Sequence, residues 1–276
     1  MSTATAEVHI PRLEHVGRVT QMRVALSEWT KLHSLRSTRW SLFAAVFLTI
    51  GFSALFAAIT SSHWGHLSPH ERADRHPIDI AQAGLNISQL AIMVLGVLVI
   101  TGEYSTGMIR ASMTAVPKRL PVLWAKLGIF AVVTFLLMLP TVLAAFFASQ
   151  AIVSKHEPLK LAFSHAGVAR AVIGGAVYLT LIGMFALAIG AIVRNTAGGI
   201  TTFVGIFFVI PPLLNVLPTS WMNAINPYIP NSAGRSIFQL THSSHSLSPA
   251  GGLAVTLGYV AAAIAIAAVL LVKRDT

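Results

Sequence analysis

The residues with the clearest chemical character lie in a polar segment, 102–126, between two long apolar runs. Its basic residues are Arg110, Lys118, Arg119 and Lys126. They face a single acid, Glu103, so the segment is strongly positive. A short loop with this bias is expected on the cytoplasmic side of a membrane. The chemistry that it offers is electrostatic, and a soluble partner could push against it.

A short helix is expected inside this segment, because 103–115 contains no proline. Such a helix would lie flat on the membrane surface until Pro117 ends it. The side chains that suit this position are Met108, Ile109, Ala111, Ser112 and Met113.

Histidines offer a second possible chemistry. His63, His66 and His70 are three and four residues apart, so one helical face could present them to a metal ion. Gly65 and Pro69 interrupt that helix, however. The interruption favours a solvated external loop over a metal site.

Composition sets the class of protein that must position these residues. The chain has 276 residues, a mean hydropathy of +0.73, and only 10% charged residues. These values are far from those of soluble domains and indicate an integral membrane protein. A helix needs about 20 apolar residues to cross roughly 30 Å of hydrocarbon. Six windows meet this length: 40–59, 81–101, 124–150, 168–193, 197–217 and 250–272.

Two regions precede the first window. Residues 1–17 are polar and mixed, and we expect a loosely ordered tail. In 18–39, apolar side chains recur at helical spacing while Arg23, Glu28 and Lys31 fall elsewhere on the wheel. This pattern predicts an amphipathic helix at the membrane surface that leads into the transmembrane domain, 40–276. A plain cytoplasmic lead-in is the alternative.

Charge predicts the orientation of the chain. Six crossings place both termini on one side, and most of the 19 Lys and Arg residues fall on that side. We therefore expect a multi-pass protein of the cytoplasmic (inner) membrane with both termini cytoplasmic. The net charge of +10 also suits nucleic acid, but these cations flank spans and are not interleaved with base-stacking aromatics. Attraction to anionic membrane lipid explains them better, so no nucleic-acid partner is expected.

Polar and proline residues inside the spans mark two further positions. Asn86 and Gln89 must face protein or a water-filled cavity, so they either line a substrate path or form interhelical hydrogen bonds. Pro211 and Pro212 should break the fifth span at membrane depth. The long external segment that follows, 218–249, is expected to include a short helix over 233–240 that dips toward the bilayer.

The order of these features resembles the type-2 ABC transporter permeases, the membrane subunits of many exporters. The resemblance covers nearly the whole chain. Its most telling local sequences are EWTKLHSLR at 28–36, E-x-S-x-G at 103–107 with P-K-R at 117–119, and Y-I-P-x-x-A-G at 228–234. It implies an all-α membrane protein with six transmembrane helices, an N-terminal amphipathic elbow helix, a cytoplasmic coupling helix and an external re-entrant-like segment.

The resemblance also implies partners. The coupling helix of such permeases docks into an ABC ATPase subunit, and a second permease copy completes a homodimer or a related heterodimer. The docking region here would include Glu103, Ser105, Gly107, Arg110, Pro117, Lys118 and Arg119. No G-x-x-x-x-G-K-[ST] motif occurs in these 276 residues. We therefore expect no enzyme activity, catalytic residue, metal or cofactor in this chain, with ATP and magnesium bound by the partner.

The expected function is ATP-driven export of an amphiphile such as a drug, an antibiotic or a lipid, because the candidate path is uncharged. The substrate path would run along the dimer seam, with contacts from Asn86, Gln89, Thr202, Phe203 and Phe207. Two alternatives remain. One is a membrane anchor for an ATPase that transports nothing. The other is an ion-coupled secondary transporter, which the scarcity of ionisable residues inside the spans disfavours.

Overall fold

A computed structural model describes residues 20–73, 75–108, 120–214, 216, 218–240 and 245–273. Within these ranges all regular structure is helical. In this described part of the chain, six helices are long and apolar enough to cross a membrane, which is the architecture of a multi-pass membrane protein. They are α2 with the short helix η1 (Arg36–His66), α5 (Leu85–Ser105), α7 (Leu120–Val153), α8 (Val168–Val193), α9 with η3 and α10 (Thr196–Leu214), and α13 (Pro249–Lys273).

Each expected window falls largely within one of these helices. The fourth, 168–193, has the bounds of α8, whereas the ends of the other five differ. The second span begins at Leu85 rather than at residue 81, because Pro77–Ala81 forms a separate short helix, α4. The turn between them packs closely on α2. A Cβ atom on Gly84 would lie 2.0 Å from the carbonyl oxygen of Thr49, and the Gly84 N–H donates to Ser53 Oγ at 3.1 Å.

Helix α8 forms the centre of the bundle and packs against α5, α7, α9 and α13. Glycines permit these close approaches, as they do between helices in membranes. A Cβ atom on Gly96 of α5 would lie 2.4 Å from the carbonyl oxygen of Gly183 on α8. A Cβ atom on Gly183 would lie 2.7 Å from the Phe130 ring of α7. The glycine-rich helix α8 therefore packs closely against α5 and α7.

The predicted break of the fifth span at Pro211 and Pro212 is wrong. The helix continues through both prolines in α10 (Ile210–Leu214), and its irregular part is the preceding π-helical turn η3 (Gly205–Val209). Pro211 has no N–H to donate to the carbonyl of Phe207, four residues earlier. Asn231 Nδ2 donates to that carbonyl instead, at 3.4 Å. A side chain from a later segment thus replaces the missing backbone bond.

The segment after the fifth span folds back onto the bundle. Helix α11 (Thr219–Ile225) and the short turn η4 (Asn226–Tyr228) lead into α12 (Pro230–Ser236), which packs against α13. Helix α12 ends four residues before the predicted limit at Leu240. Beyond it, the guanidinium of Arg170 donates to the carbonyls of Ile237 and Gln239 at 2.9 and 2.8 Å. These bonds fix the chain to the start of α8.

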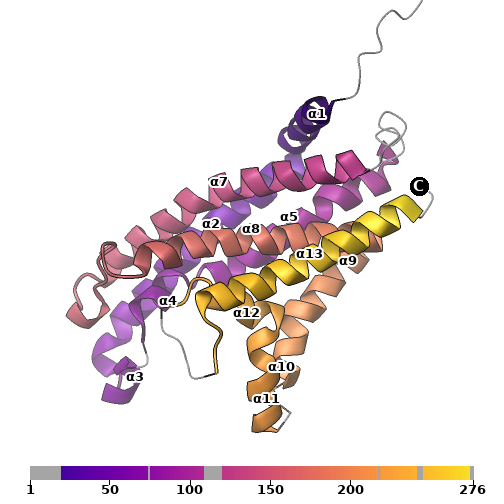
Figure 1. The fold of residues 1–276 in the computed structure, drawn as a ribbon. Coiled ribbons are helices and arrows are strands. Elements are labelled where there is room, and N and C mark those ends of the chain that lie inside the picture. Colours follow the sequence, from indigo (N-terminus) through magenta and orange to yellow (C-terminus); the bar gives the residue numbers. More distant parts are fainter. Residues whose placement is uncertain are drawn as a thin grey trace, which may run out of the picture.

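The N-terminal helix α1 (Gln21–Ser34) lies at the same end of the bundle as the C-terminal end of α13 (Figure 1). The short helix α3 (Pro69–Ala73) lies at the opposite end. Helix α1 ends before the expected residue 39, because Leu35 is extended and α2 starts at Arg36.

Helix α1 does not have one buried apolar face and one exposed charged face. Val24, Glu28 and Leu32 are buried, in a helix that packs on α7. Met22, Leu26 and Trp29 are 67%, 54% and 48% exposed, which leaves an apolar stripe on the outer face. Glu28 was expected apart from the apolar residues of the helix, but it shares the buried face of α1 with Val24 and Leu32. Its carboxylate has charged partners inside the protein, which offset the cost of burying it.

Candidate functional site

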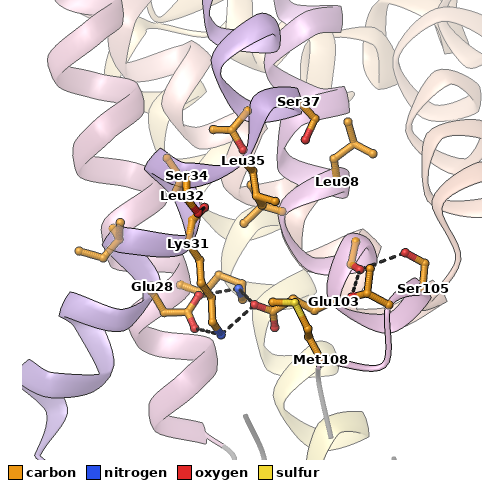
Figure 2. Close-up of a pocket in the computed structure, with 16 residues that line it drawn as sticks. Glu28, Lys31, Leu32, Ser34, Leu35, Ser37, Leu98, Glu103, Ser105 and Met108 are labelled. Carbon is orange, nitrogen blue, oxygen red and sulfur yellow. Dashed lines mark hydrogen bonds and ion pairs between the residues drawn. The ribbon is translucent and has the colours of Figure 1, made fainter. Parts of the chain in front are cut away.

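Four charged side chains form a closed ring at the α1 end of the bundle (Figure 2). We call Glu28, Lys31, Glu103 and Lys126 the charge cluster. Lys126 Nζ lies 2.6 Å from Glu28 Oε2 and 2.9 Å from Glu103 Oε1. Lys31 Nζ lies 2.8 Å from Glu28 Oε1 and 3.0 Å from Glu103 Oε1. Each cation therefore contacts both acids.

Three helices contribute to the charge cluster. Glu28 and Lys31 are three residues apart on α1, so they share one face of that helix. Glu103 lies in the last turn of α5, and Lys126 lies in the second turn of α7. The cluster thus ties α1 to the two helix ends that flank residues 106–119.

The charge cluster is buried but electrically balanced. Glu28, Glu103 and Lys126 are only 4%, 6% and 3% exposed. Burial of a single charge is expensive, and two acids paired with two bases reduce that cost. Partial burial lowers the pKa of Lys31, but its contacts with Glu28 and then Glu103 outweigh this, so the pKa is raised. Lys31 therefore remains a cation at neutral pH.

Helix α5 ends in a turn that has Gly107 in a left-handed conformation. The N–H of Thr106 donates to the carbonyl of Gly102 at 3.2 Å, and the N–H of Gly107 donates to that of Tyr104 at 3.3 Å. Gly107 has a φ of 73°, a left-handed conformation that glycine adopts without strain. This arrangement is a common helix terminus. Its place in the fold gives Gly107 a structural reason to be glycine.

The residues expected to dock a partner fall into two groups. Glu103 is buried in the charge cluster, so it contacts α1 and α7 rather than presenting a free carboxylate. Ser105 is exposed, and its hydroxyl donates to the carbonyl of Gly102 at 3.0 Å. The others lie outside the described residues: Arg110, Pro117, Lys118 and Arg119. Among the described residues of this set, Ser105 and Gly107 are the accessible ones.

The residues expected to line a substrate path do not share one cavity. Phe203 and Phe207 are 0% and 2% exposed within a single chain, and the Phe207 ring lies 6.1 Å from that of Phe185. Gln89 is 3% exposed, and its Oε1 accepts from the hydroxyl of Tyr178 at 2.5 Å. For Gln89 the structure therefore favours the interhelical hydrogen bond.

The remaining two path residues lie apart. Asn86 borders a pocket of about 280 Å³ at the α4 end of the bundle, together with His76 and Asp79. Thr202 is partly exposed on α9, and its hydroxyl donates to the carbonyl of Gly198 at 2.8 Å. Of the five path residues only these two retain exposed surface, and they lie on different helices, α5 and α9.

Sequence reasoning singled out Glu103 and Lys126 but missed Glu28 and Lys31 as site residues. The signal was present, since an acid and a base three residues apart on an amphipathic helix suggest a paired face. The partner charges, however, lie 72 and 98 residues away in the chain. Helical periodicity does not report contacts at that separation.

One of the three candidate metal ligands, His63, has a partner in its own helix. His63 Nδ1 lies 2.9 Å from the carbonyl of Ile59 in its own helix. No group of three His, Cys, Asp or Glu side chains in the described part of the chain could hold a metal ion.

No family model matches the chain, and no curated protein matches it.

Proposed function

We propose that this chain is the membrane subunit of an ATP-driven exporter of the type-2 ABC class, moving an amphiphilic substrate with a separate ATPase chain. The observation that carries the proposal is the charge cluster. It joins the surface helix α1 to the two helix ends on either side of the basic segment 106–119. A partner that pushes this segment would displace α5, α7 and α1 together.

The ion pairs of the charge cluster support the proposal. The buried ion pairs have donor to acceptor distances between 2.6 and 3.0 Å and join three helices. Such pairs are costly to break one at a time, because an unpaired buried charge remains. Force applied at the basic segment would therefore reach the bundle as movement of whole helices, as alternating access requires.

A second copy of the chain is part of the proposal. The apolar face of the fifth span is open in one chain, and only 17% of its most apolar stretch is buried. Val209, Ile210 and Leu213 are 49%, 42% and 60% exposed on this face. Six spans of this kind from each of two chains would enclose a substrate route that one chain does not. Thr202 lies on the same span and keeps its place as a candidate contact.

The orientation follows from charge. We place the charge cluster and both termini at the cytoplasmic face of the inner membrane, because most basic residues flank the spans at that end. ATP and magnesium would be bound by the partner, since the chain contains no phosphate-binding loop motif.

Co-purification tests the proposal. The tagged chain is expressed with each candidate ABC ATPase from the same organism, and the retained ATPase is measured after solubilisation. We expect retention by the wild type and loss by the charge-reversed Lys118→Glu/Arg119→Glu variant. Lys155→Glu, an exposed charge reversal at the opposite end of α7, is the matched control and should retain the ATPase. Equal retention by both variants would contradict docking at this segment.

Transport separates an exporter from a mere anchor. In vesicles containing the complex, an exporter moves a fluorescent amphiphile only when ATP is supplied. An anchor would retain the ATPase and show no ATP-dependent movement. That second result would leave docking intact and refute export.

A further inference from the structure

A pocket of about 280 Å³ lies at the end of the bundle opposite the charge cluster. It is formed by α2, by residues 75–80 and by the start of α5, whose other end carries Glu103 of that cluster. Both a base and an acid line this pocket, which distinguishes it from the apolar interior of the bundle. Four of its polar side chains are Arg75, His76, Asp79 and Asn86.

These four side chains are accessible and have no close partner. Arg75 and Asp79 are exposed, and the other two are partly exposed. None of the four side chains makes a hydrogen bond or ion pair with another residue in the described part of the chain. Other polar side chains at this end are satisfied. Glu71 accepts from the N–H of Ser68 at 2.8 Å, and His156 Nε2 lies 3.1 Å from Ser61 Oγ. Convergent polar groups that the protein leaves unbonded are available to a ligand.

The carboxylate of Asp79 lacks a close cation. Partial burial raises the pKa of this carboxyl, and the charges of His76 and then Arg235 only reduce that rise. Neither residue forms an ion pair with Asp79 in the described part of the chain. The protein alone therefore stabilises the ionised form poorly, and a cationic hydrogen-bond donor in the pocket would stabilise it.

Arg75 limits the ligand in the opposite way. Its guanidinium is exposed and lines the same pocket. The carboxylate of Glu71 feels this charge, but it bonds to Ser68 rather than pairing with Arg75. A purely cationic ligand would face this guanidinium, and a purely anionic ligand would face Asp79. A zwitterion with an ammonium group and an anionic group suits both side chains.

The position of the pocket favours a membrane lipid. Asn86 lies in the first turn of α5, so the pocket is at the depth where a span enters the membrane. On α2 the pocket reaches Phe56, which is 43% exposed, and the neighbouring Leu55 and Ile59 are 49% and 47% exposed. The volume is close to the lower limit of about 300 Å³ for small-molecule sites. It suits a lipid headgroup, with the acyl chains outside.

We propose that this pocket binds the phosphoethanolamine headgroup of a membrane phospholipid. The ammonium group donates to the carboxylate of Asp79 and to the amide oxygen of Asn86, and the phosphate accepts from the guanidinium of Arg75. The acyl chains lie along the exposed apolar side chains of α2. Such a lipid would join residues 75–80 to α2 and α5. The site needs neither an ATPase partner nor export, so it is independent of the proposed function.

Lipid titration tests the site. Native mass spectrometry of the full chain in detergent gives a dissociation constant for phosphatidylethanolamine and for phosphatidylcholine with the same acyl chains. Both lipids are zwitterionic, but the quaternary ammonium of phosphatidylcholine has no N–H to donate. We expect phosphatidylethanolamine to bind about tenfold more tightly, because a hydrogen bond to a charged group is lost in the other lipid. Equal affinities would overturn the proposal.

Two substitutions of acids separate this site from other lipid contacts. Asp79→Asn removes the charge that the ammonium group contacts and should abolish the preference for phosphatidylethanolamine. This variant should fold, because it removes a partly buried charge. Glu157→Gln is the matched control, since it removes a carboxylate that is 81% exposed at the same end of the bundle, and it should keep the preference. A preference that persists in Asp79→Asn would contradict the ammonium contact.

Two further measurements test the rest of the ligand. Arg75→Gln should weaken both lipids to the same extent, because both carry the phosphate, and unchanged affinities would refute the phosphate contact. Free glycerophosphoethanolamine has the headgroup without acyl chains. It should compete only at a much higher concentration than the lipid, and competition at the same concentration would rule out a membrane lipid as the ligand.

Discussion

Glu28 Oε2 on α1 and Lys126 Nζ on α7 are 2.6 Å apart, although 98 residues separate them in the chain. Both side chains are almost fully buried. This contact places the N-terminal helix in a defined position against the bundle rather than leaving it as a lead-in. Because a buried charge needs its partner, the pair makes the position of α1 sensitive to single substitutions.

Removal of one cluster charge should destabilise the protein. Lys126→Met leaves two buried acids facing one base, and we expect a loss of about 3 to 5 kcal/mol in the free energy of unfolding. Adding Glu28→Gln restores the balance and should recover most of that loss. Denaturant unfolding in detergent measures both. If Lys126→Met alone is as stable as the wild type, the cluster is not buried as described.

Asp79 predicts a pH effect. Burial raises the pKa of its carboxyl above the ordinary value of 3.8, although the charges of His76 and then Arg235 oppose this. A raised acid pKa contributes stability below the ordinary value, and this stability is lost as pH rises through the folded pKa. Asp79→Asn should therefore raise the melting temperature near neutral pH, and the gain should disappear near about pH 4.

Glu71 is the control with the opposite sign. Its hydrogen bonds with Ser68 lower the pKa of its carboxyl below the ordinary value of 4.5. The ionised form therefore favours the folded state, so Glu71→Gln should slightly lower the melting temperature near neutral pH and have no effect in acid. The account of Asp79 fails if Asp79→Asn lowers the melting temperature near neutral pH.

The contact between α12 and α13 can be tested with two glycines of one helix. A Cβ atom on Gly252 would lie 1.8 Å from Ser236 Oγ and 2.4 Å from the carbonyl oxygen of Ala233. Gly252→Ala should therefore cost about 1 to 3 kcal/mol in stability. A Cβ atom on Gly258 would meet nothing within 4 Å, so Gly258→Ala should be neutral or slightly stabilising. Equal effects in thermal unfolding would show that α12 does not pack here.

Gln89 can be assigned to structure or to transport by its partner. Gln89→Leu and Tyr178→Phe each remove the bond between these side chains, which in a membrane is worth about 0.6 kcal/mol. The two effects should not add in the double variant. Neither change should alter which amphiphiles are transported. An altered substrate profile for Gln89→Leu alone would return Gln89 to the transport path.

The long helices were predictable because each needs only a local apolar run, and six such runs occur. The ends of these helices were harder to predict. The second span loses its first residues to α4, and the fifth continues through Pro211 because Asn231 bonds the freed carbonyl of Phe207. These outcomes depend on side chains distant in the sequence, which a window of hydropathy does not include.

The candidate site was predictable only in part. The positive segment between α5 and α7 stands out by composition, and it draws attention to Glu103 and Lys126. Their burial, however, depends on α1 packing against α7. The same limit applies to Phe203 and Phe207, because a phenylalanine in an apolar span has the same local pattern whether it faces a seam or a core.

The most direct test of the account uses Glu28→Gln with Lys31→Met, which removes the two charges that α1 contributes to the charge cluster and leaves Glu103 and Lys126 as a pair. ATP-dependent uptake of a fluorescent amphiphile is measured in inside-out vesicles containing the chain and the ATPase partner proposed for it. We predict that the wild type transports, whereas the variant folds, retains the ATPase and hydrolyses ATP with little transport. Transport by the variant at the wild-type rate would contradict coupling through the charge cluster.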